Sequence, residues 1–423
     1  MPLYIAQLAA PQGEDQKWMW AVVPFNMALG PLGTFIPIYI LKLGGNAITV
    51  GLAVTLYNGM VIPASIIWGL AVDATGWRRK LVSMSYGVTT AMLFLLFFAR
   101  DAYSVALTYA AIGIFSAASS TPISLLVMET APKEKWASAF SALNLMASAG
   151  VTAGLLFATL YTSAFSMREM MIVLGVFGLS STATAVLLIK DPPLPLERRS
   201  LSMHPAALSS RLLSTPLFFL RIPRLRHFYR FAKERWRTGN PTFPLYLSLF
   251  LFYVASGLFN TMISPGLYTK GLTESEVFAV IMAGYVVQTL SFHISGKFIE
   301  KRGEKVSART ALYLRALGYS GIAFFVIFLG AIETLGASLV FYPLAAGFAY
   351  AVFYASSNVM IFKTLGAHAG TNLGIYSSLV SVATLLGSFV SGYTSFYLGY
   401  GFTYLLAAGF LVACAETLKW VKL

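Results

Sequence analysis

The sequence predicts an all-α integral membrane protein with twelve transmembrane helices in two pseudo-symmetric six-helix halves. Apolar residues make up 57% of the 423 residues and charged residues only 11%, which is roughly half the charged fraction of a soluble domain. The apolar runs are mostly about 20 residues long, enough to cross about 30 Å of hydrocarbon as a helix. One short loop motif occurs once in each half, so the two halves are expected to be related.

The first half, residues 1–189, holds six predicted spans. Pro24, Pro31 and Pro37 lie in the first span, and prolines in a spanning helix are tolerated where neighbours or a cavity satisfy the freed carbonyls. We therefore expect this helix to bend beside a cavity. The fifth span is rich in small residues such as Gly150 and Gly154, which allow close helix packing in lipid. The six approximate ranges are Trp18–Leu41, Ile48–Val72, Leu81–Ala99, Val105–Met128, Trp136–Tyr161 and Met170–Ile189.

The second half, residues 243–423, repeats this plan. Gly387 and Gly392 in its fifth span occupy the place of the small-residue run in the first half. The six approximate ranges are Phe243–Tyr268, Val277–Ile299, Ala308–Leu329, Leu335–Phe362, Thr371–Leu398 and Phe402–Val421.

A basic linker, residues 190–242, joins the halves. It carries eleven Lys and Arg residues against three acids. Leu225, Phe228 and Trp236 fall on one helical face with arginines on the other, which predicts an interfacial helix drawn to anionic lipid headgroups of the cytoplasmic leaflet. The alternative is a solvated linker with only partial helix.

The net charge of +14 is distributed as in a membrane protein and does not indicate nucleic-acid binding. Lysines and arginines gather in alternate loops, and the other loops hold only Lys42, Arg100, Arg168 and Lys270. This bias predicts a multi-pass protein of the cell (plasma) membrane with both termini in the cytoplasm. The first residues lack the pattern of a cleaved signal peptide, so the first span is expected to act as the insertion signal.

The sequence shows no catalytic or metal-binding constellation. The single cysteine, Cys414, excludes an internal disulfide, and no histidine stands beside an acid within the predicted spans. We therefore expect no enzyme activity, no cofactor and no metal site.

The repeated loop follows the pattern Gly-x-x-x-acid-x-x-Gly and is followed by basic residues. It lies between the second and third spans and again between the eighth and ninth. Glycines suit a tight turn between two helices because they accept positive φ and close approach. The motif residues are Gly69, Asp73, Gly76 and Arg78 in the first copy and Gly296, Glu300 and Gly303 in the second.

This motif resembles the signature loop of the major facilitator superfamily, and the resemblance covers essentially the whole chain in topology. The basic residue usual after the acid is Ala74 here. The resemblance implies a transporter whose halves rock about a solute site at the membrane midplane. It also implies that Asp73 contacts the start of the eleventh span, near Thr371 to Gly374, when the cytoplasmic gate is shut.

The resemblance implies that spans one, four, seven and ten line the solute cavity and that spans two, five, eight and eleven contribute further residues to it. Polar and aromatic residues are found in those spans, and such groups are costly in hydrocarbon unless paired. Neutral amides and phenols suit a neutral or weakly polar ligand. The cavity candidates are Asn26, Tyr57, Asn58, Asn144, Tyr253, Asn260, Tyr285, Gln288, Tyr350, Tyr354 and Asn358.

The energy coupling is left open by the sequence. No Asp or Glu lies in the middle of a predicted span, and His293 is the one possible proton site, although a lone histidine also fits a simple hydrogen-bonding role. The resemblance does not extend to the antiporter arginine, because Ala110 stands at its position, nor to the sugar-porter motif, replaced by Asp191-Pro192-Pro193.

Arg315 is the one charge well inside a predicted span, about 10 Å from its start. A charge at that depth must pair or extend to the surface. Because the ninth span is expected to be peripheral, we favour snorkelling of this side chain to the cytoplasmic headgroups over anion binding.

These observations predict a monomeric secondary transporter that moves a small organic solute by alternating access. The alternative on the same scaffold is a multidrug or lipid exporter or flippase; a non-transporting receptor and a membrane-embedded enzyme are further alternatives. A polar cavity holding Asn260, Gln288 and Asn358 favours the solute carrier, whereas an apolar cavity with lateral openings favours the lipid version.

The resemblance generates a prediction for Asp73. We expect Asp73→Asn to slow transport and to leave ligand binding largely intact, because the acid stabilises one conformation and not the bound solute. Uptake rates and ligand affinities of the two proteins measure this. An unchanged transport rate contradicts the assignment.

Overall fold

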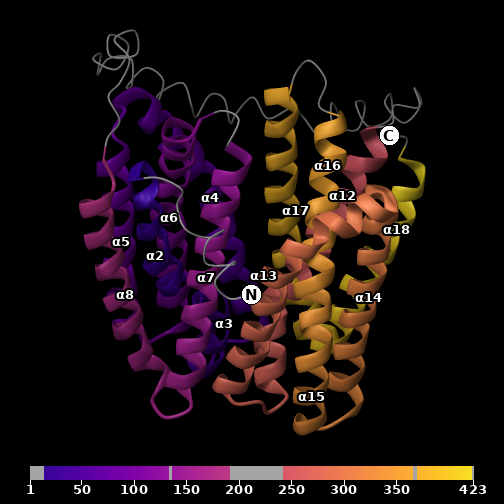
Figure 1. Ribbon diagram of the computed structural model, residues 1–423. Helices are drawn as coiled ribbons and strands as arrows, with labels where there is room; N and C mark the ends of the chain where they lie inside the picture. The colour runs from indigo at the N-terminus through magenta and orange to yellow at the C-terminus, as the bar shows by residue number, and fades with distance from the viewer. Residues whose placement is uncertain (1–13, 133–135, 191–241, 365–368, 422–423) are drawn as a thin grey trace, which may run out of the picture.

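The computed structural model describes residues 14–132, 136–190, 242–364 and 369–421. Within these ranges the chain forms helices and no strand. Twelve segments are long and apolar enough to cross a membrane. They form two six-helix groups that stand side by side, drawn in indigo to magenta and in orange to yellow (Figure 1). The predicted fold class is therefore confirmed.

The first span starts as a 3₁₀ helix, continues as an α-helix and is broken once. The break falls at Gly30 and Pro31, where Pro31 has no N–H to donate and the N–H of Gly30 still bonds the carbonyl of Asn26 at 2.8 Å. The break therefore falls at one of the three prolines where a bend was expected. The elements are η1 (Glu14–Ala21, a 3₁₀ helix), α2 (Val22–Leu29), α3 (Leu32–Lys42), α4 (Ala47–Thr75), α5 (Arg78–Phe98), α6 (Ala102–Thr130), α7 (Trp136–Thr162) and α8 (Met167–Leu188).

The second half contains one break that we did not predict. Its fourth span consists of α15, a π-helical segment η3 and α16, and Pro343 opens the π segment because a proline removes a regular helix hydrogen bond. The elements are α12 (Thr242–Thr269), α13 (Glu274–Arg302), α14 (Glu304–Phe328), α15 (Ala331–Tyr342), η3 (Pro343–Ala349), α16 (Tyr350–Thr364), α17 (Ala369–Leu398), α18 (Tyr400–Thr417) and η5 (Leu418–Trp420). The predicted interfacial helix of the linker lies in residues 191–241, outside the described residues.

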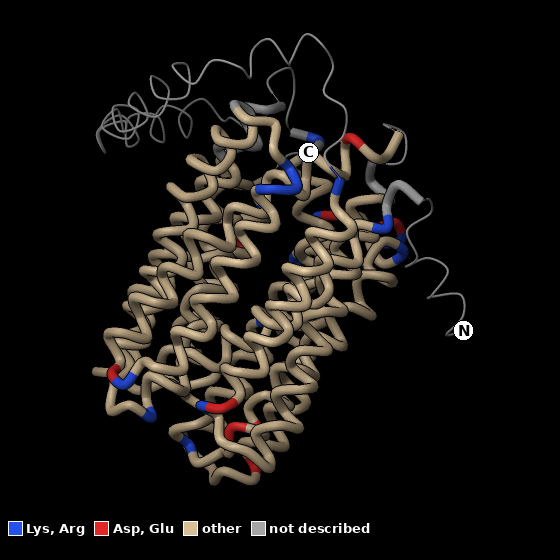
Figure 2. The backbone as a smooth tube through the Cα atoms, turned by 90° about the vertical axis from the view of Figure 1, so that its left-hand side faces the viewer, with Lys and Arg blue, Asp and Glu red and all other residues tan. Residues whose placement is uncertain are grey.

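The bundle has two distinct ends. We call the end that carries the turns after α4 and α13 and the C-terminus the terminal end, and the other the opposite end. The described charges gather at these two ends and leave the middle of the bundle almost free of colour (Figure 2). At the opposite end Asp101 caps α6, and hydrogen bonds from the backbone of Ser104, its side chain and the backbone of Tyr103 lower the pKa of the carboxyl.

Glycines allow pairs of helices to approach closely in both halves. A Cβ on Gly154 would lie 3.0 Å or less from the backbone of Met27, so α7 packs tightly on α2. In the second half Gly387 of α17 faces Gly257 and the carbonyl oxygen of Val254 on α12. The close packing expected for these small residues is confirmed, and it sits at equivalent places in the two halves.

This close packing predicts that adding a methyl group at Gly387 destabilises the protein. We expect Gly387→Ala to lower the free energy of unfolding by about 1–3 kcal/mol, because its Cβ meets backbone atoms that cannot move aside. Gly409→Ala in α18 is the matched control, since no atom lies within 4 Å of its added Cβ. Thermal unfolding of the purified protein compares the two, and equal melting temperatures contradict the prediction.

Candidate functional site

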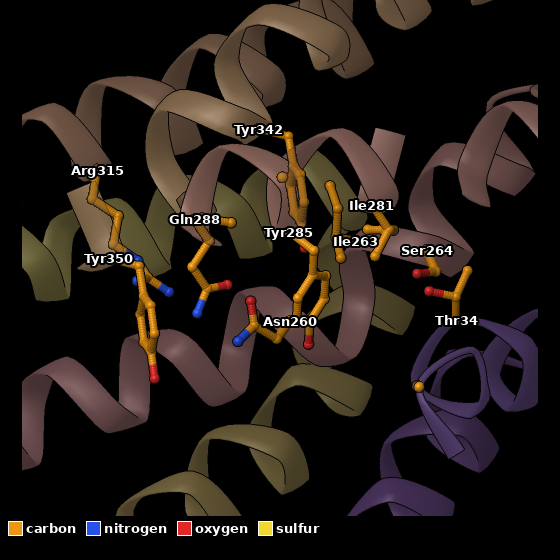
Figure 3. Close-up of a pocket in the computed structure, with 14 residues that line it drawn as sticks. Thr34, Asn260, Ile263, Ser264, Ile281, Tyr285, Gln288, Arg315, Tyr342 and Tyr350 are labelled. Atoms are coloured by element: carbon orange, nitrogen blue, oxygen red, sulfur yellow. The ribbon is translucent and has the colours of Figure 1, made fainter. Parts of the chain in front are cut away.

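A partly open cavity of about 250 Å³ lies between the halves. The first half contributes the start of α3, and the second half contributes α12 to α16 (Figure 3). The volume is slightly below the roughly 300–1,000 Å³ of common ligand pockets, so it fits a small solute. Its lining consists of Gly30, Gly33, Thr34, Asn260, Ile263, Ser264, Ile281, Gly284, Tyr285, Gln288, Arg315, Tyr342, Ala346 and Tyr350.

Both irregular backbone segments border this cavity. Gly30 and Gly33 flank the break between α2 and α3, and no atom lies within 4 Å of a Cβ built on Gly33, which leaves that side open. The π segment η3 lies between Tyr342 and Tyr350. Irregular backbone is tolerated at membrane depth where it lines a cavity, which accounts for its position here.

Two amides and several hydroxyls provide hydrogen-bonding groups in the cavity. The side chains of Asn260 on α12 and Gln288 on α13 point toward the same space, with Tyr285 beside them (Figure 3). Among the described residues neither amide has a protein hydrogen-bond partner, so both are available to a solute or to water. Gly284 has no Cβ and thereby lets the ring of Tyr342 lie directly against α13.

Arg315 also lines the cavity, which corrects the expectation that it snorkels. It is the twelfth residue of the 25-residue helix α14, and only 1% of its surface is exposed. Its Nε donates to the hydroxyl of Tyr319 at 2.8 Å and one Nη donates to Ser256 at 3.3 Å. The guanidinium turns into the bundle because these partners and three aromatic rings surround it there.

The structure brings four of the eleven cavity candidates together: Asn260, Tyr285, Gln288 and Tyr350. Tyr354 lies close to them, since it stacks on Tyr350 with ring centroids 5.8 Å apart. Tyr253 is not part of the lining, and its hydroxyl bonds that of Tyr376 at 3.0 Å.

The other five candidates do not line the cavity. Asn26 bonds the carbonyl of Val22 in its own helix, and Tyr57 stacks on Tyr109. Asn58 donates to Ser388 of the other half at 3.4 Å. Asn144 is exposed and Asn358 is half-buried, and both lie outside the cavity.

His293, the possible proton site, lies on α13 beyond the cavity lining and is exposed. It follows Gln288 by five residues toward the terminal end of the helix. The structure therefore places it apart from the residues that face the cavity, and its role in coupling stays a prediction.

The two loop motifs form the expected tight turns. Gly76 has φ +69° and Gly303 has φ +78°, values that an L side chain rarely adopts. Arg78 is 4% exposed and forms an ion pair with Glu129 at 2.7 Å, which ties the first loop to the end of α6. Gly69, Gly296 and Glu300 lie in the helices that lead into these turns. The side chains of Asp73 and of residues 371–374 lie outside the described part, so their contact stays a prediction.

Described contacts join the halves from the opposite end to the middle of the bundle. Lys42 forms an ion pair with Glu274, and Ser275 donates to the carbonyl of Thr159 at 2.8 Å. A Cβ on Gly51 would meet the Cα of Gly392 at 2.7 Å, so α4 and α17 touch there. Toward the terminal end the ribbons of α4 and α17 stand further apart (Figure 1).

Sequence reasoning missed several lining residues, including Thr34, Ser264 and Tyr342. A membrane serine or threonine most often bonds its own helix, so it carries little signal by itself. Pro343 is the signal that could have identified the break beside Tyr342.

Comparisons with known proteins agree with this arrangement. A family model described as Major Facilitator Superfamily matches residues 19–342. A search of curated protein sequences finds no match. A crystal structure of the nucleoside transporter NupG is 11% identical, with 96% of this chain and 98% of that chain covered and a TM-score of 0.71.

Other solved structures have the same fold. A D-xylose-proton symporter is 14% identical over 99% of this chain and 97% of its own, with a TM-score of 0.68. A POT family transporter in complex with 5-aminolevulinic acid is 11% identical over 95% and 93%, with a TM-score of 0.67. Identities this low show the shared fold and leave the solute to be found by other means.

The cavity predicts that Gln288 contacts the solute. We expect Gln288→Ala to weaken solute binding by about three- to tenfold, the equivalent of one lost hydrogen bond. Asn144→Ala is the control, because Asn144 is an amide outside the cavity. Ligand-dependent thermal unfolding measures both affinities, and equal affinities for the two variants contradict a contact at Gln288.

Proposed function

This chain belongs to the Major Facilitator Superfamily and is a multi-pass secondary transporter of that kind, and we propose that it moves a small organic solute across the cytoplasmic membrane by alternating access. Proteins of this family are generally not enzymes, and we propose that this chain has no catalytic activity. The observation that carries the proposal is the small polar cavity between two six-helix halves.

The contacts between the halves indicate which conformation of the proposed transport cycle the structure represents. With both termini in the cytoplasm, as we propose from the charge bias, the opposite end faces outward. The ion pair between Lys42 and Glu274 and the contact of Gly51 with Gly392 then close the outward side. The structure corresponds on this basis to an inward-facing conformation.

The cavity favours a polar solute over the alternative of lipid or multidrug export. Its volume of about 250 Å³ is small for acyl chains, and its lining contains two free amides, three tyrosines and one arginine. Polar lining groups gain from a solute that replaces their water hydrogen bonds. Membrane lipids are proposed partners only at the linker, and the protein is proposed to act as a monomer.

A ligand screen tests the proposal. The purified protein is unfolded thermally in the presence of sugars, amino acids, organic anions, drugs and lysolipids. A ligand at about 100 times its Kd should add roughly 2.7 kcal/mol of stability. Each stabilising compound is then tested for uptake into proteoliposomes. Stabilisation by lysolipids or drugs alone supports the exporter instead.

The alternating-access mechanism predicts that holding the outward side shut stops transport. We expect a Lys42→Cys, Glu274→Cys protein to lose uptake of its solute after reaction with a short bismaleimide, because the two side chains are in contact across the halves. Each single substitution, Lys42→Cys or Glu274→Cys, treated in the same way, controls for modification alone, and the native Cys414 is buried. Full uptake by the cross-linked protein shows that transport does not require residues 42 and 274 to separate, and this outcome contradicts the prediction.

A further inference from the structure

Arg315 is a buried cation with no acidic partner among the described residues. The described ion pairs involve Lys42, Arg78, Lys363 and Lys419 and none includes Arg315. A charge in a medium of low dielectric is costly unless it is compensated, and truly uncompensated buried charges are rare. Arginine does not lose its proton under such conditions, so the charge is retained.

The surroundings hold the guanidinium without neutralising it. Its carbon lies 4.9, 5.3 and 5.1 Å from the ring centroids of Phe252, Tyr319 and Tyr350. Rings at these distances stabilise a cation through their π electrons but add no negative charge. The hydroxyls of Tyr319 and Ser256 each accept one hydrogen bond from the guanidinium. The second Nη is buried and has no hydrogen-bond partner.

Arg315, which carries this unpaired nitrogen, is part of the lining of the cavity of the proposed solute. Arg315, Gln288 and Tyr350 lie next to one another at one side of it (Figure 3). A carboxylate suits a guanidinium, because its two oxygens accept two parallel hydrogen bonds from the guanidinium nitrogens. The amides of Gln288 and Asn260 then face the remainder of such a ligand, and the tyrosine rings contact its apolar part.

We propose that the solute is a small organic monocarboxylate whose carboxylate binds Arg315. This inference rests on the proposed transport function and narrows it to one class of solute. A single negative charge follows from the single cation in the cavity lining. The cavity volume of about 250 Å³ restricts the solute to a small molecule.

The experiment compares acids with their neutral amides on the full-length purified protein. The probes are pyruvate, lactate, nicotinate and benzoate, each paired with its amide, with thermal unfolding and direct binding as readouts. We expect at least one acid to stabilise the protein while its amide does not. Neutral amides that bind as well as the acids, or acids that have no effect, overturn the proposal. Because this comparison uses the natural protein, it does not depend on how a variant folds.

Two variants assign the effect to Arg315. We expect Arg315→Gln to weaken binding of the acid by about thirtyfold or more, the cost of removing a buried charge partner. Arg315→Lys keeps the charge but loses the paired hydrogen bonds, so an intermediate affinity is expected. Arg309→Gln on the same helix is the control, because Arg309 bonds the carbonyl of Ala415 and lies outside the cavity. Acid binding that is unchanged in Arg315→Gln overturns the assignment.

Uptake assays separate this proposal from the proposed function. If sugars or other neutral solutes stabilise the protein and are transported, the transport function holds and the carboxylate proposal fails. If proteoliposomes take up none of the compounds that bind, the transport function itself fails. Uptake of an acid that is lost in Arg315→Gln and kept in Arg309→Gln supports both.

Discussion

In the hydrocarbon of a membrane, every backbone N–H and carbonyl must find a partner inside the protein, and this constraint governs the whole structure. It accounts for long uninterrupted helices over nearly all described residues. It also restricts where the chain can depart from a regular helix. The break at Gly30 and Pro31 and the π segment Pro343–Ala349 both contribute residues to the lining of the cavity between the halves, which is where irregular backbone is tolerated in a membrane.

Helix association in lipid depends on close packing, because the lipid tails are as apolar as the side chains that they meet. The chain uses glycines for this purpose within each half, at Gly154 against α2 and at Gly387 against α12. The pair Gly51 and Gly392 brings the same kind of contact to the boundary between the halves. Because both residues are glycine, α4 and α17 meet there through their backbones.

The charged side chains at the ends of the bundle differ from the one in its interior in how their charges are compensated. The partly exposed ion pair of Lys42 with Glu274 lies at the opposite end, where water screens its charges. The buried Arg78 lies near the terminal end and is paired with Glu129. Arg315 is different because it lies within the bundle, 1% exposed, among rings and hydroxyls. A buried charge of this kind costs stability unless a partner compensates it, and this cost is the basis of the proposed binding of a carboxylate.

The sequence by itself determined the class of the protein, because hydropathy and run length directly reflect the thickness of a bilayer. It determined the two-half plan and the turns at Gly76 and Gly303, since only glycine readily accepts their positive φ. Four cavity residues, Asn260, Tyr285, Gln288 and Tyr350, were among the candidates because amides and phenols are unusual in hydrocarbon.

Only the tertiary structure decided which polar groups face one another. It separated Gln288 from Asn144 and Asn26, which look alike in sequence but lie on other helices and outside the cavity lining. The tertiary structure also decided where the Arg315 side chain points, because a long flexible side chain can extend either to the headgroups or into the interior. It points inward because helix packing places Tyr319, Ser256 and the three aromatic rings there. Those contacts join residues up to 63 positions apart in the chain, so no local pattern contains them.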